Sequence, residues 1–490
     1  MSTSAEAPVF GNLLADAWVQ GSGGDPLEVR DPADLRIVVG RVPSMTPEDV
    51  GAAYQAAAAG LEVWRATGPL DRATVLQRAA HLLRRDQQDL AGLIVSEMGK
   101  TLAEAGVEVA KTADFFDFYA SLARLPQGEL LADARPGTRT EVRVEPVGVV
   151  LAITPWNDPL LTPARKLAPA LAAGNAVVIK PSEESPLITL RLAQVLRDAG
   201  LPPGVLGTVT GSSRVLSDAL LLDPRVAAVT FTGSTPVGRL LEGRLAGTGV
   251  RLQSETGGKN ASVVLADADL ELAASVVTSA AFAQSGQRCT ATSRLVVDAS
   301  VADAFMDLLL DRVSRIVVGP GRDPRTTMGP VVSKAQQRTA LEHVVTARDA
   351  GARVVHGGRT PTDELLAHGC FVEPTVVDGV TPDMRLWREE VFGPVLAVAT
   401  CHGLDEAVAL VNDSAYGLAA AVFTTSLTAS ASFVERVDVG QVAVNLPTAG
   451  WDVHHPFGGF RDSGSPFKEQ GTSGLRFYTR LKTAAVRHEW

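Results

Sequence analysis

The chain has 490 residues, of which 46% are hydrophobic and 20% charged, and its formal net charge is −10. This length allows about three domains, each with its own core. The negative charge argues against a nucleic-acid-binding protein, because phosphate binding requires clustered Lys and Arg. The three cysteines, Cys289, Cys370 and Cys401, are too few for a disulfide framework and favour a reducing compartment.

No basic segment followed by an apolar one opens the chain, and no apolar run approaches ~18 residues, so we expect neither a signal peptide nor a membrane span. Spacing typical of a zinc site is also absent from the sequence, and we expect no metal. These features predict a cytoplasmic protein.

After a polar start, Thr46 begins a helix signature. Thr46 can cap, Pro47 suits the first turn, and Asp49 follows three residues after the cap. Residues 50–64 and 72–97 then carry apolar side chains at helical spacing, which predicts helices that pack in a core.

Strand and helix patterns alternate from about residue 141. Continuous apolar runs at 147–153, 176–179 and 226–231 predict strands buried on both faces, and 165–172 and 187–199 predict helices between them. This order indicates a doubly wound parallel sheet, in which ligands bind at the carboxyl ends of the strands. A second α/β series follows, with strands at 293–297, 354–355 and 395–399 and a helix at 301–316.

Cys289 is the leading candidate nucleophile. A lone thiol is more often a small buried hydrophobe. Here, however, Gly286 and Arg288 precede it, so the thiol could be partly exposed beside fixed positive charge, which favours the thiolate.

Other candidates follow the predicted strands. Glu255 stands before paired glycines and could activate water, and Asn157 could stabilise an oxyanion or act as a turn residue. Lys180 and Glu183 could hold ribose hydroxyls or form a solvated surface pair, and the Gly-rich turn at 233–238 could bind a phosphate.

Together these segments carry a family resemblance. In order along the chain, they resemble motifs of the NAD(P)-dependent aldehyde dehydrogenase superfamily. The motifs are TPWN at 154–157, KPSE at 180–183, FTGST at 231–235, ETGGK at 255–259, GQRC at 286–289, EVFGP at 390–394, Asn412 with YGL at 416–418, and PFGG at 456–459.

The resemblance implies an activity: oxidation of an aldehyde to its carboxylic acid. Cys289 would attack the aldehyde, and Asn157 with the Cys289 backbone N–H would stabilise the oxyanion. After hydride transfer to the nicotinamide, Glu255 would activate the water that hydrolyses the thioester. The presence of Glu255 favours hydrolysis over transfer of the acyl group to coenzyme A.

The resemblance also implies a cofactor site. Lys180 and Glu183 would hold the adenosine ribose and Ser234 the pyrophosphate, Glu390 and Phe392 would serve the nicotinamide ribose and its surroundings, and Thr154 and Trp156 belong to the same site. Because Glu183 should repel a 2′-phosphate, we expect NAD, with NADP as the other possibility.

Three departures from the family pattern bear on these roles. Ser212, Ser213 and Ser217 stand in a segment near the expected adenine pocket where the family often has a different glycine pattern. Asp158 replaces the aromatic residue that commonly follows the Asn, in a stretch expected to line the substrate tunnel. Thr256 stands where an apolar residue usually follows the Glu.

Arg165 occupies a position where dehydrogenases of succinic semialdehyde carry an Arg for the substrate carboxylate. Residues 288–294 and 468–471 also resemble dehydrogenases of α-ketoglutaric semialdehyde. We therefore expect a carboxylate-bearing semialdehyde as substrate. Alternatively, Arg165 pairs with Asp158 or another acid and touches no substrate.

The resemblance implies three parts. We expect an α/β fold with a doubly wound parallel-sheet cofactor domain at 1–124 and 147–257 and an α/β catalytic domain at 258–466. A small β oligomerisation element at 125–146 and 467–490 would complete it, and strands that reach a neighbour would cover exposed sheet edges. We expect a homodimer or homotetramer.

Two other functions remain open at this point. A thiol esterase or acyl transferase could use Cys289 and Glu255 without redox chemistry, although it would need no dinucleotide site. A structural protein of this fold could lack turnover, which the presence of Cys289, Asn157 and Glu255 disfavours.

Overall fold

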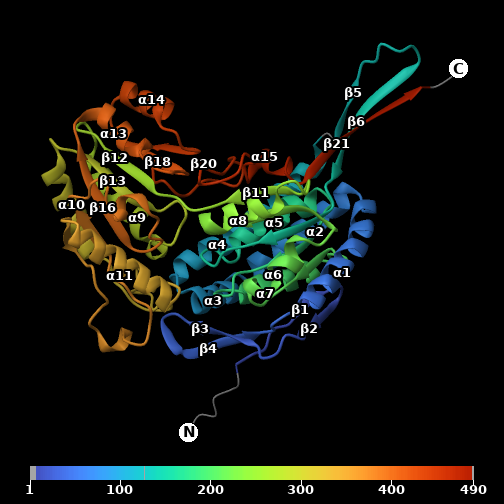
Figure 1. Ribbon diagram of the computed structural model, residues 1–490, viewed down its shortest axis with the longest axis horizontal. Helices are drawn as coiled ribbons and strands as arrows, with labels where there is room; N and C mark the ends of the chain where they lie inside the picture. The colour runs from blue at the N-terminus through green and yellow to red at the C-terminus, as the bar shows by residue number, and fades with distance from the viewer. Residues whose placement is uncertain (1–6, 126, 488–490) are drawn as a thin grey trace, which may run out of the picture.

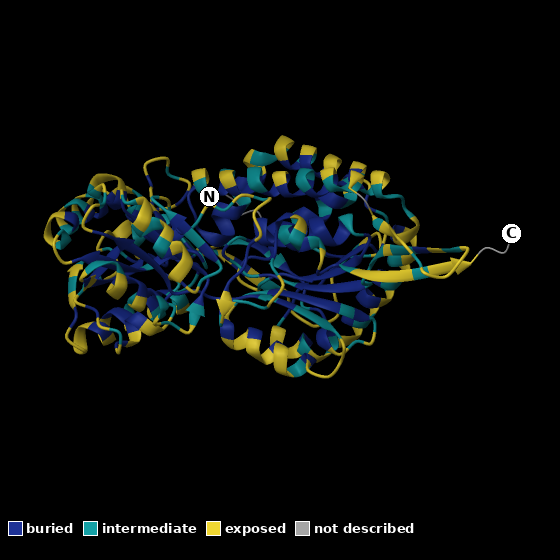
Figure 2. Cartoon of the chain, turned by 90° about the horizontal axis from the view of Figure 1, so that it is seen from above, coloured by how far each residue is buried: buried dark blue, intermediate teal, exposed yellow. Residues whose placement is uncertain are grey.

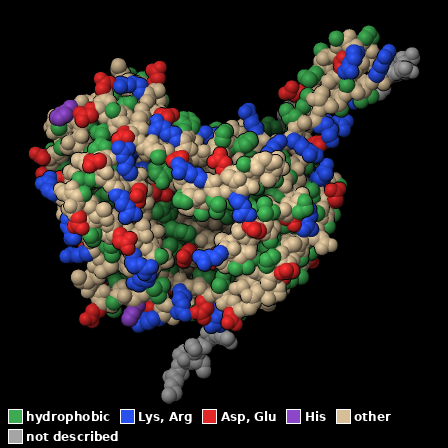
Figure 3. Space-filling view, viewed as in Figure 1, with side chains coloured by type: hydrophobic (Ala, Val, Ile, Leu, Met, Phe, Trp, Pro, Cys, Tyr) green, Lys and Arg blue, Asp and Glu red, His purple; other side chains and the backbone are tan. Residues whose placement is uncertain are grey.

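The computed structural model describes residues 7–125 and 127–487, arranged as two α/β bodies and a projecting β arm (Figure 1). Side chains of Lys and Arg are interspersed with Asp and Glu over the face drawn in Figure 3, and that face is hollowed between the two bodies. None of the helices among these residues is long and apolar enough to cross a membrane.

The first body is built on a five-stranded parallel sheet in the order β11-β10-β7-β8-β9. Successive residues of β7 and β8 face two different cores: Val150 and Val177 pack in one, Leu151 and Val178 in the other. Apolar side chains on both faces explain the continuous apolar runs in the sequence. The strands are β7 (Val149–Ile153), β8 (Ala176–Lys180), β9 (Leu206–Thr208), β10 (Val226–Thr232) and β11 (Arg251–Glu255).

The strand order confirms the predicted doubly wound sheet, because the chain changes direction of winding between β7 and β10. Helices cover both faces of this sheet, as Figures 1 and 2 show. They are α1 (Pro47–Ala66), α2 (Pro69–Arg85), α3 (Gln87–Met98), α4 (Leu102–Ser121), α5 (Leu161–Ala172), α6 (Leu187–Asp198), α7 (Ser213–Leu221) and α8 (Thr235–Leu245).

The second body contains a seven-stranded sheet in the order β14-β15-β16-β13-β12-β18-β19. Only the β14–β15 pair is antiparallel among the described pairs of this sheet. Its strands are β12 (Asn260–Val264), β13 (Thr292–Asp298), β14 (Arg353–His356), β15 (Thr375–Asp378), β16 (Val395–Cys401), β18 (Ala419–Phe423) and β19 (Gln441–Val444). Its longer helices are α9 (Leu270–Phe282), α10 (Ala302–Ser314), α11 (Lys334–Asp349), α13 (Gly403–Asn412) and α14 (Leu427–Arg436).

The arm is a three-stranded antiparallel sheet that extends away from both bodies (Figures 1 and 2). It joins β5 (Gly128–Leu131) and β6 (Thr138–Pro146) to β21 (Thr479–Arg487), strands that lie far apart in the sequence. Residue 126 and residues 488–490, which belong to the expected oligomerisation element, lie outside the described residues, as do residues 1–6.

No element was predicted before Thr46, but the N-terminal region contains four strands. It forms β1 (Asn12–Leu14), β2 (Ala17–Val19), β3 (Leu27–Asp31) and β4 (Asp34–Val42). These strands are short or carry charged residues on exposed positions, so their apolar alternation is weak.

The predicted helix at 72–97 is two helices, α2 and α3. Asp86 lies between them at φ −97° and ψ 15°, outside helical geometry, and both flanking helices continue the same apolar spacing. The capping box at Thr46 is confirmed: its side chain accepts from the Asp49 N–H, and the Asp49 carboxylate accepts from the Thr46 N–H at 2.9 Å.

Candidate active site

Cys289 lies on a tightly held loop between α9 and β13. The preceding residues Gln284, Ser285 and Gly286 take left-handed conformations with φ of 52°, 57° and 68°, and a Cβ at Gly286 would collide with the carbonyl of Gly393. The Asn260 amide donates to the Cys289 carbonyl at 2.7 Å. The loop therefore fixes the position of the thiol.

The electrostatics of Cys289 differ from the sequence interpretation. The thiol is half-buried, and burial raises the pKa of Cys289 to about 12. Arg165, not the adjacent Arg288, is the cation that opposes this rise in the pKa. The expectation that Arg288 favours a thiolate is wrong: Arg288 Nε donates to Gln284 Oε1 at 2.6 Å, and the resting thiol is protonated at neutral pH.

Asn157 and Glu255 lie in the same cavity as Cys289. Asn157 follows β7, is buried, and donates one amide hydrogen to the Gln287 carbonyl at 3.0 Å, which ties it to the Cys289 loop. Its second amide hydrogen makes no hydrogen bond with a described residue. The arrangement leaves that hydrogen free to meet an oxyanion beside the thiol.

Glu255 ends β11 and is only 3% exposed. Its two carboxyl oxygens have no hydrogen-bond partner among the described residues. Burial, followed by the nearby Glu469 carboxylate, raises the pKa of Glu255 well above its usual value. A carboxylate with a raised pKa and free lone pairs is suited to accept a proton from water.

An ion pair behind Glu255, between Lys166 and Glu469, was not predicted from the sequence. Lys166 of α5 is buried and donates to Glu469 at 2.7 Å and to the Thr230 hydroxyl at 3.0 Å. They come from segments about 300 positions apart, and only the fold brings them together.

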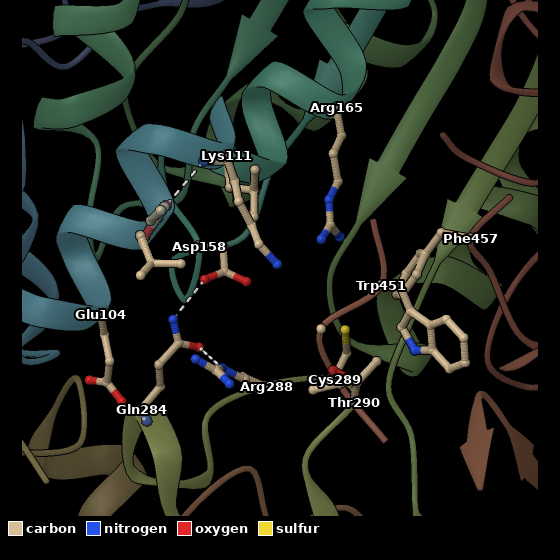
Figure 4. Close-up of a pocket in the computed structure, with 15 residues that line it drawn as sticks. Glu104, Lys111, Asp158, Arg165, Gln284, Arg288, Cys289, Thr290, Trp451 and Phe457 are labelled. Atoms are coloured by element: carbon tan, nitrogen blue, oxygen red, sulfur yellow. Dashed lines mark hydrogen bonds between the residues drawn. The ribbon is translucent and has the colours of Figure 1, made fainter. Parts of the chain in front are cut away.

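Cys289 lies where two cavities meet. One has a volume of about 200 Å³ and contains Asn157, Glu255 and Glu390 in its walls. The other, of about 100 Å³, lies toward α4 and is drawn in Figure 4. The thiol can therefore meet a molecule from either side.

The first cavity opens onto the carboxyl ends of the parallel strands, where most of the predicted cofactor residues lie. Thr154 directly follows β7 and Lys180 ends β8, and the Thr154 N–H donates to the Lys180 carbonyl at 3.1 Å. The hydroxyls of Thr154 and Thr232 are buried and have no partner among the described residues. Trp156 packs edge-on against Phe392 at 5.2 Å between ring centroids.

Phe392 takes a left-handed conformation, with φ of 55°. Glu390 accepts from the Gly258 N–H at 2.8 Å, and a Cβ at Gly257 would collide with its other oxygen. Burial raises the pKa of Glu390 to about 7. The paired glycines thus leave space for this carboxylate at the cavity wall.

Glu183 and Ser234 lie farther along the same edge. Ser234 is the exposed N-cap of α8, and its side chain makes no cap hydrogen bond. Glu183 accepts from the Ser213 N–H at 2.8 Å at the start of α7, and its carboxylate lies 3.9 Å from Lys180 Nζ. The open N-terminus of α8 suits a phosphate.

The second cavity contains both predicted substrate residues. Asp158 Oδ1 accepts from Lys100 Nζ and from Gln284 Nε2, each at 3.0 Å. Although burial opposes it, Lys100 holds the pKa of Asp158 well below its usual value. Neither Lys100 nor Gln284 was singled out from the sequence, because nothing local marks them.

Arg165 makes no ion pair with a carboxylate in the described part of the chain, so the alternative in which it pairs with Asp158 is not observed. Its guanidinium lies over the Phe457 ring at 4.9 Å and near the Phe115 ring at 5.9 Å. Figure 4 shows it pointing into the cavity above Cys289. The fork is held by rings and remains available to an anion.

Comparison with known proteins identifies the family. The model described as "Aldehyde dehydrogenase family" matches residues 18–484. The chain belongs to the aldehyde dehydrogenase family. This confirms the predicted resemblance, and as a member of the family the chain is a nicotinamide-dependent oxidoreductase that converts an aldehyde to an acid.

Several relatives match over nearly their whole length. A 2,5-dioxopentanoate dehydrogenase of Saccharolobus solfataricus is 42% identical over 474 residues, covering 96% of this chain and 98% of the relative. An alpha-ketoglutarate semialdehyde dehydrogenase of Haloferax volcanii is 41% identical, with coverage of 96% and 98%.

Among solved structures, the betaine aldehyde dehydrogenase of Staphylococcus aureus in complex with NAD+ is similar. It is 33% identical, the alignment covers 97% of this chain and 95% of that one, and the TM-score is 0.95. This similarity confirms the predicted fold class, in which a Rossmann-like cofactor domain is combined with an α/β catalytic domain.

Proposed function

We propose that this aldehyde dehydrogenase oxidises a carboxylate-bearing semialdehyde with NAD, and that α-ketoglutaric semialdehyde is its substrate. The observation that carries this is the placement of Cys289 between two cavities. One cavity has polar groups suited to a dinucleotide, and the other contains cations without acid partners. The names of the relatives cited above support the same substrate.

Cys289 acts as the nucleophile. Because burial raises its pKa to about 12, it must lose its proton as it attacks the aldehyde carbon. The second amide hydrogen of Asn157 and the Cys289 backbone N–H stabilise the oxyanion of the resulting thiohemiacetal.

Glu255 acts after the aldehyde carbon has been oxidised to a thioester. Its raised pKa and unpartnered oxygens suit it to take a proton from the water that attacks the thioester, which releases the acid and regenerates the thiol. Behind it, the Lys166 ammonium and the Glu469 carboxylate form an ion pair, so the two together add no net charge beside Glu255.

The residues of the first cavity, together with those on the sheet edge beside it, fit a nicotinamide dinucleotide. Glu390 and the Trp156–Phe392 pair suit the nicotinamide ribose and its surroundings. The N-terminus of α8 at Ser234 suits the pyrophosphate. Lys180 and Glu183 suit the adenosine ribose. Thr154 and Thr232 offer unpartnered hydroxyls at the same edge. When bound, the cofactor accepts the hydride. We favour NAD over NADP because the Glu183 carboxylate would repel a 2′-phosphate.

Arg165 holds the carboxylate of the substrate. Its fork can donate two parallel hydrogen bonds, and its position over Phe457 limits its freedom before binding. Asp158, held by Lys100 and Gln284, shapes the same cavity wall.

The division into parts and the assembly state are also proposals. We propose a cofactor domain at 1–124 and 147–257, a catalytic domain at 258–466 and an oligomerisation element at 125–146 and 467–490. Exposed Leu130 and Leu481 on the arm support its burial against a second copy, in a homodimer or homotetramer. The unpaired cysteines support a cytoplasmic location.

A direct assay tests the function. Absorbance of reduced nicotinamide is followed with 2,5-dioxopentanoate, 5-oxopentanoate and pentanal, with NAD and NADP in parallel. We expect both carboxylate aldehydes to exceed pentanal in kcat/KM by about tenfold or more, since a charged hydrogen bond contributes about 1.5–3 kcal/mol. Arg165→Met should remove this preference, and Cys289→Ser should abolish turnover. Pentanal turnover equal to that of both acids would refute the substrate class.

The same assay separates the alternatives. A thiol esterase would hydrolyse an activated ester through Cys289 but reduce no nicotinamide with any aldehyde, and a protein without turnover would do neither.

A further inference from the structure

The cavity drawn in Figure 4 contains more cationic groups than one carboxylate requires. Lys111 of α4, Arg165 of α5 and Arg288 all line it, together with Cys289. Lys111 and Arg165 both extend into the open space on the side opposite Cys289 (Figure 4). Arg165 is proposed to bind the substrate carboxylate, so Lys111 is a further cation with no assigned role.

The acids of this cavity do not use Lys111. Glu108 accepts from Lys100 at 2.5 Å, and Asp158 accepts from Lys100 and Gln284 at 3.0 Å each. Glu104 accepts from the Gln284 N–H at 2.7 Å. In residues 7–125 and 127–487, the side-chain ammonium of Lys111 has no hydrogen bond and no ion pair. It is a half-buried ammonium group without a partner at the wall of a substrate cavity.

The other two cations are already constrained. The Arg165 guanidinium is positioned by the Phe457 and Phe115 rings. Arg288 is tied to Gln284 Oε1 at 2.6 Å, and Figure 4 shows its guanidinium beside that amide. Lys111, on a flexible stem with three donors, is the group free to reach a second acceptor of the substrate.

We propose that Lys111 is a specificity-determining residue that donates to an oxo oxygen beside the substrate carboxylate while Arg165 holds the carboxylate itself. This rests on the proposed function. A carboxylate and an adjacent oxo group present three acceptor oxygens, more than a single guanidinium fork can satisfy. A substrate with a carboxylate alone leaves Lys111 without a partner, so the enzyme selects semialdehydes of 2-oxo acids.

Burial, together with Arg165 and Arg288, lowers the pKa of Lys111, and the carboxylates of Asp158 and Asp452 offset this only in part. A substrate oxygen that accepts a hydrogen bond from the ammonium offsets the cost of burying this charge, whereas an alkyl chain does not.

Two aldehydes of equal length test the proposal. 2,5-Dioxopentanoate and 5-oxopentanoate have the same five carbons and the same carboxylate, and only the first has the 2-oxo group. The kcat/KM ratio of the two is measured for the wild type, Lys111→Met and Lys111→Arg. Methionine keeps the unbranched stem and helix propensity, and the melting temperature and NAD binding of each variant verify its fold.

We expect the wild type to prefer the 2-oxo substrate by about tenfold or more, which corresponds to about 1.4 kcal/mol. Lys111→Met should bring the ratio close to one by lowering kcat/KM for the 2-oxo substrate, and Lys111→Arg should retain part of the preference.

Two outcomes in the variants would overturn the proposal. An unchanged ratio in Lys111→Met would mean that the ammonium does not contact the oxo group. An equal loss for both substrates would make Lys111 a general attractor of anions. Failure of the proposed function is visible separately in the wild type, because neither carboxylate aldehyde would then have a higher kcat/KM than pentanal. That result would overturn the proposal for Lys111 too.

Discussion

Replacement of Glu255 by Gln gives a direct test of the second half of the reaction. Gln has nearly the same shape, and the carboxyl oxygens of Glu255 have no hydrogen-bond partner among the described residues, so the substitution breaks no observed bond. It also removes a buried acid next to Glu469. We therefore expect the fold and the attack by Cys289 to persist while proton transfer from water is lost.

The expected effect is large. A positioned general base contributes about 100- to 10,000-fold to a rate, and the raised pKa of Glu255 makes it an effective base near neutral pH. Steady-state turnover of Glu255→Gln should therefore fall by about 100-fold or more. In stopped-flow absorbance, one equivalent of reduced nicotinamide per Cys289 should form rapidly and then accumulate slowly, because the thioester persists.

Two results would contradict this reasoning. Absence of the rapid phase would mean that Glu255 acts before hydride transfer, for example on the Cys289 thiol. Steady-state turnover above about a tenth of the wild type would mean that another group supplies the base. Cys289→Ser serves as the control, since it should show neither the rapid nor the slow phase.

The stability of the same variant has a defined pH dependence. Because the pKa of Glu255 is raised on folding, the folded wild type binds a proton that the unfolded chain has released. The wild type therefore loses stability as pH rises from the unfolded pKa through the folded pKa, and Glu255→Gln does not. The melting temperature of the variant relative to the wild type should increase between pH 5 and pH 8, and an equal difference at both would contradict the burial of the charge.

Three further predictions use the same geometry. The rate at which iodoacetamide alkylates Cys289 in the free enzyme, measured by mass spectrometry of the peptide, should rise about tenfold per pH unit from pH 7 to 10, because the pKa of Cys289 is about 12. Arg165→Met should slow the alkylation. A rate that reaches a plateau near neutral pH would exclude the raised pKa. Gly257→Ala should keep the melting temperature within a few degrees, because the three atoms nearest to its Cβ all belong to the end of the Glu390 side chain, yet it should raise KM for NAD by about tenfold. An unchanged KM would mean that Glu390 does not contribute to cofactor binding. Glu183→Gln should raise kcat/KM with NADP relative to NAD by about tenfold, and an unchanged ratio would mean that this carboxylate does not select the cofactor.

The parallel sheet could be predicted from the sequence because its physical cause is local. Strands buried on both faces read as continuous apolar runs, and β7, β8 and β10 were found within a few residues of their bounds. The N-terminal strands β3 and β4 were missed because charged Glu28, Arg30 and Arg36 face solvent on them and few of their positions are fully buried.

The network behind the site could not be predicted, because its members are paired by tertiary contacts. Lys166 of α5 meets Glu469, and Lys100 of the loop before α4 meets Asp158, only after α5 packs on the sheet and α4 packs on α5. A lone lysine looks like a surface residue in the sequence, since Lys is rarely fully buried unless paired. Both lysines have fully buried side chains, and both are paired.

Cys289 shows why adjacency in the sequence is a poor guide to electrostatics. Arg288 is its neighbour in the chain, but its guanidinium is bound by Gln284, whereas Arg165 acts on the thiol from 124 positions away. Arg165 is also the group proposed to bind the substrate carboxylate. A bound carboxylate neutralises the cation that lowers the pKa of Cys289, so substrate binding by itself should make the thiol harder to ionise. The proton of Cys289 must therefore leave in the same step as attack on the aldehyde.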